Sequence, residues 1–324
     1  MKLATLKNGT RDGRLVVVSK DLTQCVSVPL IAATLIEALE NWTYCELPLQ
    51  KCYQALNNGD IPSERFDPNN AMAPLPRSHQ FIDASAFLNH GDIMEKAFNL
   101  DVKKDPDVPI LIQRQSDDFM GPCEDYIFPS EKDHADFEGE FAVITSDIPM
   151  QAAPEETHKQ IRLITILNDM SMRKYLFREL QMGFGFILAK PATVFAPVAV
   201  TPDELGEAWQ DGRIQLNMEV KRNGEWFGHP NGSEMDFSFA EILSHIAYNR
   251  NIKAGMILGS GTVSNKNWRE VGSACLAERR ALDIIEYGET RTDFLTFGET
   301  LRFEVFDQHK QSIFGAIEHR MVSS

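Results

Sequence analysis

The chain has 324 residues, of which 43% are hydrophobic and 24% charged, with a formal net charge of −15. This length can bury a large core and fits one large domain with a smaller one. The negative charge argues against nucleic acid or an anionic membrane surface as the main partner. The longest strongly apolar stretch, Val28 to Ile36, is too short to cross a bilayer. Five irregularly spaced cysteines without a Cys-x-x-Cys pair predict reduced thiols in a cytoplasmic protein.

The first 75 residues are expected to form a small N-terminal domain with its own strands and helices. Short apolar runs predict strands at Lys2–Leu6 and Arg14–Ser19. Pro29 suits the first turn of a helix over Pro29–Trp42. A second helix is expected over Leu47–Leu56, followed by a proline-spaced linker from Pro62 to Pro76.

Residues 76–324 are expected to form a β-rich domain, so the fold class is α+β. Arg162 to Ile166 is strand-like, and Asn223-Gly224 suits a type I′ turn between two strands over Ile214–Arg222 and Glu225–Gly228. Capping-box patterns at Thr201-Pro-Asp-Glu204 and Ser238-Phe-Ala-Glu241 predict a short helix and a helix over Phe239–Asn249, respectively. Two C-terminal strands are expected over Thr296–Phe306 and Ser312–His319.

The segment Phe137-Glu-Gly-Glu-Phe-Ala-Val-Ile144 contains two glutamates one residue apart in an apolar run. Strand side chains alternate between faces, so Glu138 and Glu140 would share one face. Two like charges on a half-buried strand repel each other, and a bound cation would remove this penalty. An all-oxygen site suits Mg²⁺, Ca²⁺ or Mn²⁺ rather than zinc. The alternative for this pair alone is a solvent-facing strand with two exposed acids.

Further polar residues lie at the ends of expected elements. Asp169 follows the apolar run Leu163–Leu167, and Arg173 lies four residues later. Lys190 lies in Ala-Lys-Pro, and Thr262 lies in Gly-Ser-Gly-Thr-Val-Ser. Upstream, Ala-Pro-Leu-Pro76 leads into Phe-Ile-Asp83, and His90 lies seven residues beyond Asp83.

Taken in this order, these five segments resemble the fumarylacetoacetate hydrolase family over residues 72 to 306. The resemblance implies a rolled, mixed β-sheet domain, a divalent cation and a homodimer. It also implies a small oxo-acid substrate, with hydrolytic C–C cleavage, decarboxylation, tautomerisation or hydration as the chemistry. The segments that carry it are Ala-Pro-Leu-Pro, Asp-Phe-Glu-Gly-Glu-Phe-Ala-Val, Leu-Asn-Asp-x-Ser-x-Arg, Ala-Lys-Pro and Gly-Ser-Gly-Thr-Val-Ser.

By this resemblance, Asp83, Glu138, Glu140 and Asp169 are the metal carboxylates. His90 falls at the position of the base that activates water, with Glu278 as the acid that orients it and Glu270 as the alternative. Arg173 and Lys190 match cationic groups near the substrate, and Thr262 matches a substrate-contacting hydroxyl. Outside the family context, Arg173 could be an ion-pair partner of Asp169, and Lys190 a lysine in solvent.

The residues that would face the substrate depart from the fumarylacetoacetases. Two stretches where those enzymes carry tyrosines read Ala84-Ser85-Ala86 and Ile112-Gln113-Arg114-Gln115, and Leu176 replaces a glutamine. We therefore expect a hydrolase of 2,4-dioxo acids with an altered pocket. The alternatives are a 2-oxo acid decarboxylase, tautomerase or hydratase, or a relative that binds metal without turnover. A charged, weakly patterned loop over residues 89–109 is a candidate lid.

Overall fold

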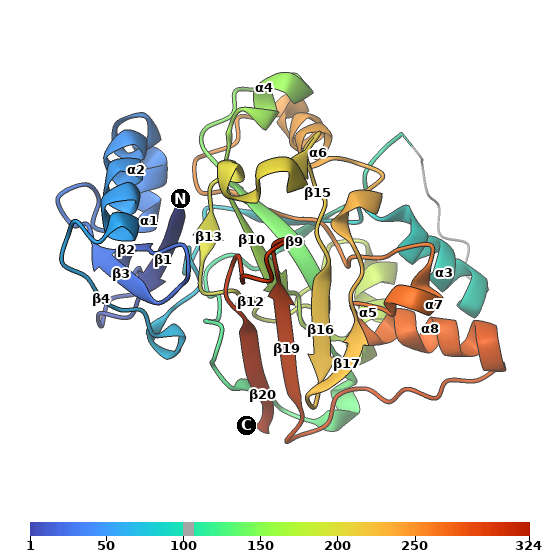
Figure 1. Cartoon of the computed structure of the whole chain (residues 1–324). Coiled ribbons are helices and arrows are strands. Elements are labelled where there is room, and N and C mark those ends of the chain that lie inside the picture. Colours follow the sequence, from blue (N-terminus) through green and yellow to red (C-terminus); the bar gives the residue numbers. More distant parts are fainter. Residues whose placement is uncertain (100–106) are drawn as a thin grey trace.

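A long mixed sheet runs through the molecule (Figure 1), which was studied as a computed structural model that describes residues 1–99 and 107–324. The sheet has eleven strands, with β12 (Val194–Phe195) beside β10 and the others in one row. In spatial order these are β4 (Glu64–Arg65), β3 (Gln24–Ser27), β2 (Arg14–Val18), β1 (Lys2–Leu6), β13 (Ala199–Val200), β10 (Ile161–Asn168), β9 (Gly139–Thr145), β18 (Ile257–Gly259), β5 (Phe81–Ala84) and β6 (Leu111–Arg114). This mixed sheet with packed helices confirms the predicted fold class.

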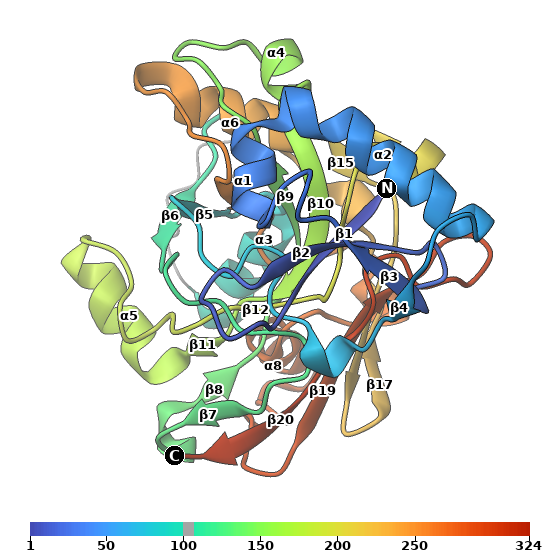
Figure 2. The same ribbon diagram turned by 90° about the vertical axis from the view of Figure 1, so that its left-hand side faces the viewer.

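The N-terminal strands form one end of this sheet, because β1 pairs with β13. Helices α1 (Leu35–Glu40) and α2 (Trp42–Asn58) cover these strands, as Figure 2 shows. The predicted helix over Pro29–Trp42 is wrong at its start, because Thr34 provides the N-cap through a hydrogen bond from the Glu37 amide. The second helix is longer than predicted and contains Pro48, while β4 and a 3₁₀ turn, η1 (Pro68–Asn70), lie in the expected linker.

A second sheet has five strands in the order β17-β16-β19-β20-β7. Its strands are β17 (Glu225–Gly228), β16 (Met218–Arg222), β19 (Thr300–Val305), β20 (Ile317–Ser323) and β7 (Tyr126–Phe128). Asn223 and Gly224 both have positive φ, which confirms the predicted turn between β16 and β17. Both C-terminal strands exist, although each begins about four to five residues later than predicted.

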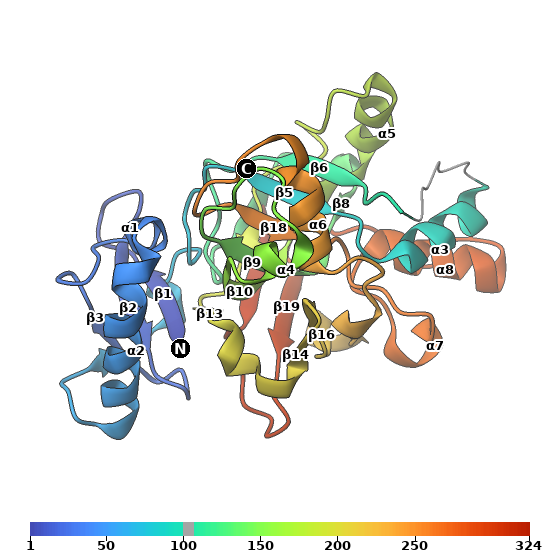
Figure 3. The same ribbon diagram turned by 90° about the horizontal axis from the view of Figure 1, so that it is seen from above.

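Helices α3 (Leu88–Phe98) and α8 (Leu276–Tyr287) lie side by side (Figures 1 and 3). Ile93 of α3 packs against Ala281 and Leu282 of α8. The predicted loop over residues 89–109 is therefore wrong up to Phe98, and α3 ends at Asn99 in a left-handed conformation. Residues 100–106, on which the rest of the lid hypothesis falls, lie outside the described residues.

The two expected capping boxes have different outcomes. At Ser238 both reciprocal hydrogen bonds form, and they open α6 (Phe239–Ile246) as predicted. At Thr201 the box is absent, because the hydroxyl contacts the Met1 nitrogen, and a 3₁₀ segment, η3 (Pro202–Ala208), follows. The remaining elements are α4 (Pro154–His158), α5 (Arg173–Met182), α7 (Trp268–Val271), β8 (Ala135–Asp136), β11 (Ser171–Met172), β14 (Trp209–Gln210), β15 (Arg213–Ile214), η2 (Glu131–Asp133), η4 (Gly232–Glu234) and η5 (Ala247–Asn249).

The central strands are buried on both faces, and their alternate side chains enter two separate hydrophobic clusters. Phe141 and Val143 of β9 pack into one cluster, whereas Ala142 and Ile144 pack into the other. This double burial fixes the register of β9 and hence the position of Glu140. Among the described residues, no helix is long and apolar enough to span a membrane.

Candidate active site

Three carboxylates from neighbouring strands converge at one end of the large sheet. Asp83 lies on β5, Glu140 lies on β9, and Asp169 directly follows β10. All three are buried, and one oxygen from each lies within 4.8 Å of the others. The strand order β10-β9-β18-β5 therefore builds the cluster from segments far apart in the sequence. We call Asp83, Glu140 and Asp169 the acidic trio.

Two glycines near the end of β18 make room for the acidic trio. Gly259 lies between Asp83 and Ala142 in the strand register, and a Cβ there would lie 2.7 Å from Glu140 Oε2 and 3.0 Å from Asp83 Oδ1. The amide of Gly261 donates to Asp83 Oδ1 at 3.0 Å and to Glu140 Oε2 at 3.1 Å. Gly261 has a φ of +77°, and a Cβ there would lie 2.1 Å from the Ala84 oxygen. The glycine-rich segment is thus shaped around the carboxylates.

Burial and the nearby carboxylates make ionisation of Asp83 and Glu140 unfavourable. Burial, then the charge of Asp169, raises the pKa of Asp83 to about 7. Burial and the charges of Asp83 and Asp169 raise the pKa of Glu140 well above its ordinary value. Asp169 differs: burial opposes its ionisation, but Arg114 and Lys190 lower its pKa below the usual range. Asp83 and Glu140 are therefore the two carboxylates whose ionised forms a bound cation would stabilise most.

The donor set fits a divalent metal ion. Glu140 Oε1 is a buried carboxylate oxygen with no hydrogen-bond partner among the described residues. Such an orphan is costly in a protein interior unless it meets a cation. The oxygens of three carboxylates match the ligand preference of Mg²⁺, Ca²⁺ and Mn²⁺.

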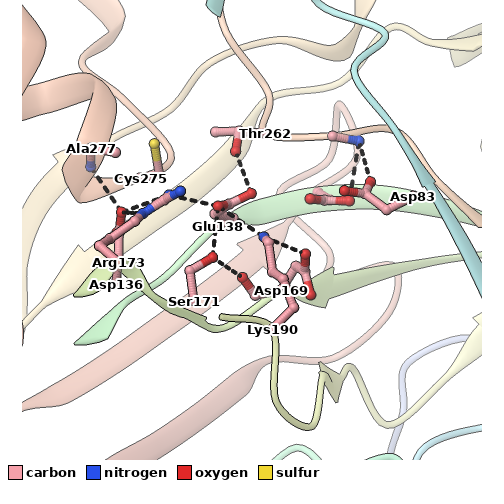
Figure 4. Close-up of polar contacts among 12 residues, drawn as sticks. Asp83, Asp136, Glu138, Asp169, Ser171, Arg173, Lys190, Thr262, Cys275 and Ala277 are labelled. Carbon is pink, nitrogen blue, oxygen red and sulfur yellow. Dashed lines mark hydrogen bonds and ion pairs between the residues drawn. The ribbon is translucent and has the colours of Figure 1, made fainter. Parts of the chain in front are cut away.

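Glu138 contacts both Arg173 and Lys190, as Figure 4 shows. Its Oε1 accepts hydrogen bonds from Arg173 (2.6 Å) and Ser171 (2.8 Å) and lies 3.0 Å from Lys190 Nζ. Thr262 Oγ1 donates to its Oε2 at 3.0 Å. Burial opposes its ionisation, but Lys190 and Arg173 together hold its pKa below the ordinary value. Both oxygens are thus occupied by protein donors, and metal ligation by Glu138 stays a prediction.

His90 forms a pair with Glu278 across the packed helices α3 and α8. His90 Nδ1 lies 2.8 Å from Glu278 Oε2, and Ser273 donates to the other carboxylate oxygen at 2.9 Å. Glu278 is fully buried, and each of its carboxylate oxygens has a side-chain partner. Glu270, the alternative acid, is exposed on α7. A carboxylate facing Nδ1 favours the tautomer with the proton on Nδ1, in which Nε2 carries the lone pair.

His90 and Asp83 of the acidic trio line one cavity of about 210 Å³. Its lining includes Asp83, Glu138, Arg173, Lys190 and Thr262, together with His90. The structure therefore brings these sequence-predicted residues, with Glu140 and Asp169 directly behind them, into one site.

The comparisons with known proteins agree with this geometry. A family model described as "Fumarylacetoacetate (FAA) hydrolase C-terminal" matches residues 80–322. Another, "Fumarylacetoacetase N-terminal domain 2", matches residues 1–77. The chain belongs to the fumarylacetoacetate hydrolase family.

Its relatives in this family are enzymes with several activities. The 2,4-didehydro-3-deoxy-L-rhamnonate hydrolase of Sphingomonas sp. is 26% identical over 160 residues, which cover 48% of this chain and 53% of that protein. The mitochondrial oxaloacetate tautomerase Fahd2a of Rattus norvegicus is 25% identical over 194 residues, covering 59% of this chain and 58% of the relative. Each match thus spans little more than half of the curated relative.

Solved structures share the fold over the whole chain. Maleylpyruvate hydrolase from Sphingobium sp. SYK-6, crystallised with manganese(II) and pyruvate, matches all of both chains with a TM-score of 0.67 at 15% identity. At this identity the match establishes the common architecture.

Two buried residues of the family site were not found by sequence reasoning. Arg114, on β6, donates to both oxygens of Asp169, and its Nη1 donates to the Lys190 carbonyl at 3.0 Å. Asp136 accepts hydrogen bonds from the Leu276 and Ala277 amides at the start of α8 and from Arg173 Nε at 2.8 Å. Asp136 therefore ties Arg173 to the helix that carries Glu278. Asp136 could have been suspected because it lies two residues before Glu138 in the sequence. The sequence around Arg114 contains no motif that would have indicated its role.

Proposed function

We propose that the chain is a divalent-metal-dependent hydrolase that cleaves a C–C bond in a 2,4-dioxo acid. The observation that carries this proposal is that His90, paired with Glu278, lines the same cavity as Asp83 of the acidic trio. Metal binding alone would serve several reactions of the family. A base oriented by a buried carboxylate is what water activation requires in addition.

In this proposal Asp83, Glu140 and Asp169 hold Mg²⁺, Ca²⁺ or Mn²⁺, with Glu138 beside them. The cation would polarise the 2-oxo group of the substrate as a Lewis acid. Its relative from Sphingobium, crystallised with manganese(II) and pyruvate, supports both the metal and the 2-oxo acid product. Thr262, Arg173 and Lys190 line the cavity next to this position and would orient the substrate carboxylate.

His90 would take a proton from water through Nε2, while Glu278 stabilises the imidazolium. The water oxygen attacks the acyl carbonyl carbon, and the C–C bond then breaks with its electron pair moving to the departing enolate. The enolate takes up a proton at carbon, so the products are a carboxylic acid and pyruvate. Lys190 and Arg173 line the cavity and would stabilise the negative charge that develops.

The test is the loss of enol ultraviolet absorbance from a panel of acylpyruvates and fumarylacetoacetate, with Mg²⁺, Mn²⁺ or chelator. We expect metal-dependent loss that falls by a factor of about 10² or more in His90→Ala. His79→Ala serves as the matched control, because His79 is exposed and lies outside the cavity. Full activity in His90→Ala would overturn the hydrolytic mechanism, and no turnover by a metal-binding protein would favour a non-catalytic relative.

A second candidate is tautomerisation or decarboxylation of a 2-oxo acid. The family relatives named oxaloacetate tautomerases favour it. This chemistry needs the metal and Lys190 but no water-activating base. Conversion of enol to keto oxaloacetate that persists in His90→Ala, without C–C cleavage, would support it.

We also propose that the protein is a cytoplasmic homodimer, consistent with its five free cysteines. Helix α5 and the segment after it project from the body of the molecule (Figures 2 and 3). Large apolar side chains are exposed there, with Phe184 94% and Ile187 80% accessible. Apolar patches of this kind mark interaction sites. Light scattering would test the dimer, and a monomer at micromolar concentration would contradict it.

A further inference from the structure

The cavity has two chemically different ends. Its inner end is lined by Asp83, Glu138, His90 and the two cations, which are buried or partly buried, whereas its outer wall consists of apolar side chains that are partly buried or exposed. The residues of this outer wall are Leu88, Ile110, Ile112, Leu176, Leu180 and Phe186. We propose that the outer wall selects 2-oxo acids whose far end is uncharged and apolar, and excludes those with a second carboxylate. This rests on the proposed function in placing the 2-oxo acid end at the acidic trio.

The two cations that line the cavity already form ion pairs with carboxylates at its inner end. Arg173 lies 2.7 Å from Asp136 and 2.6 Å from Glu138. Lys190 lies 2.7 Å from Asp169 and 3.0 Å from Glu138. Among the described residues, no arginine or lysine lines the outer wall. A distal carboxylate would therefore lose water there without gaining a charged partner, which is unfavourable.

An apolar group that covers the outer wall would bind favourably, because part of the wall is exposed to water. Leu176 and Leu180 are four residues apart on α5, so they lie on one face of the helix. Leu180 is 60% exposed and Ile110 is 38% exposed in the free cavity. An alkyl or aryl acyl group would remove these surfaces from water, which stabilises the complex in proportion to the apolar area covered.

The first experiment measures binding without turnover, using Mn²⁺-loaded protein and saturated 2-oxo acids. The series runs from pyruvate through 2-oxobutanoate and 2-oxopentanoate to 2-oxohexanoate, with 2-oxoadipate as the dicarboxylate of equal chain length. We expect affinity to rise about fourfold per methylene, because burying one CH₂ contributes about 0.8 kcal/mol and 1.36 kcal/mol is tenfold. We expect 2-oxoadipate to bind at least about tenfold more weakly than 2-oxohexanoate. Equal or tighter binding of 2-oxoadipate would overturn the proposal.

The second experiment places a charge on the outer wall. Leu180→Lys should weaken 2-oxohexanoate binding and tighten 2-oxoadipate binding about fivefold, the ratio that 1 kcal/mol of a half-exposed ion pair represents. Leu47→Lys is the matched control, because Leu47 is a leucine of equal exposure (61%) on α2, outside the cavity. It should leave both affinities unchanged. An unaltered preference in Leu180→Lys would show that the outer wall does not contact the ligand.

Turnover separates failure of this inference from failure of the proposed function. Acylpyruvate cleavage together with tighter binding of 2-oxoadipate would overturn only the apolar selection. The expected binding order without cleavage of any acylpyruvate would overturn the hydrolase and retain the apolar selection. Cleavage of acetyl-, butanoyl- and hexanoylpyruvate with rising kcat/KM, and poor cleavage of fumarylpyruvate, would support both.

Discussion

Replacing Asp83 by asparagine should stabilise the metal-free protein, although it removes a predicted metal ligand. Burial and Asp169 raise the pKa of Asp83 from 3.8 to about 7 in the folded state. The neutral acid therefore contributes stability that is fully present below pH 3.8 and is lost as the pH rises through about 7. One unit of pKa corresponds to about 1.36 kcal/mol, so the loss is of the order of 4 kcal/mol at pH 8. Asparagine is neutral at every pH, and its side-chain oxygen can still accept from Gly261.

Urea denaturation followed by tryptophan fluorescence, in chelator at pH 5 and pH 8, measures this difference. We expect Asp83→Asn to exceed the unmodified protein in free energy of unfolding at pH 8, by up to about 4 kcal/mol, and by less at pH 5. Mn²⁺ at about 1,000 times its Kd should cancel this difference, because it adds about 4.1 kcal/mol to the protein that binds it, and higher concentrations should reverse the order. Asp60→Asn, at an exposed carboxylate, is the control and should change stability by less than about 0.5 kcal/mol. An Asp83→Asn protein that is less stable than the unmodified protein in chelator at pH 8 would show that the Asp83 carboxylate is not destabilising.

Three further changes test other parts of the site. Gly259→Ala should weaken Mn²⁺ binding by about tenfold or more in calorimetric titration, because its Cβ would meet Glu140 Oε2 at 2.7 Å; unchanged affinity would contradict the role assigned to this glycine. Asp136→Asn should lower the free energy of unfolding by about 2–4 kcal/mol, because it leaves the mostly buried Arg173 with Glu138 as its carboxylate partner. Asp12→Asn, which breaks the more exposed ion pair with Arg77, should lower it by less than about 1 kcal/mol. Equal losses in the two variants would contradict a structural role for the Asp136–Arg173 pair. Glu278→Gln should reduce kcat by a factor of about 10² or more at unchanged metal affinity, measured by steady-state kinetics beside the same titration; an unaffected kcat would remove Glu278 from the reaction.

Local elements were predictable where the sequence carries a local physical signal. The Ser238 capping box and the Asn223-Gly224 turn involve contacts within four residues, and both form as expected. The similar pattern at Thr201 fails because a distant group, the Met1 nitrogen, binds its hydroxyl instead. Pro29 suits a first helical turn, but the Thr34 cap starts α1 later. Tertiary contacts and competing caps therefore decided the cases that local pattern left open.

The same division applies to the candidate site. The Glu-x-Glu strand pointed to paired carboxylates, but the sequence could not indicate that Glu138 would be occupied by Arg173, Lys190 and Thr262 while Glu140 keeps an unpartnered oxygen. The pairing of His90 with Glu278 joins residues 188 positions apart, so it depends on the packing of α3 against α8.

The central claim is that His90 directs water to a C–C bond of a 2,4-dioxo acid next to the acidic trio. Product analysis by nuclear magnetic resonance, with an acylpyruvate, Mn²⁺ and either the unmodified protein or His90→Ala, tests this most directly. We expect equimolar pyruvate and carboxylic acid from the unmodified protein, and neither product from His90→Ala or in chelator. Carbon dioxide release, or enol-to-keto conversion without cleavage that continues in His90→Ala, would contradict it.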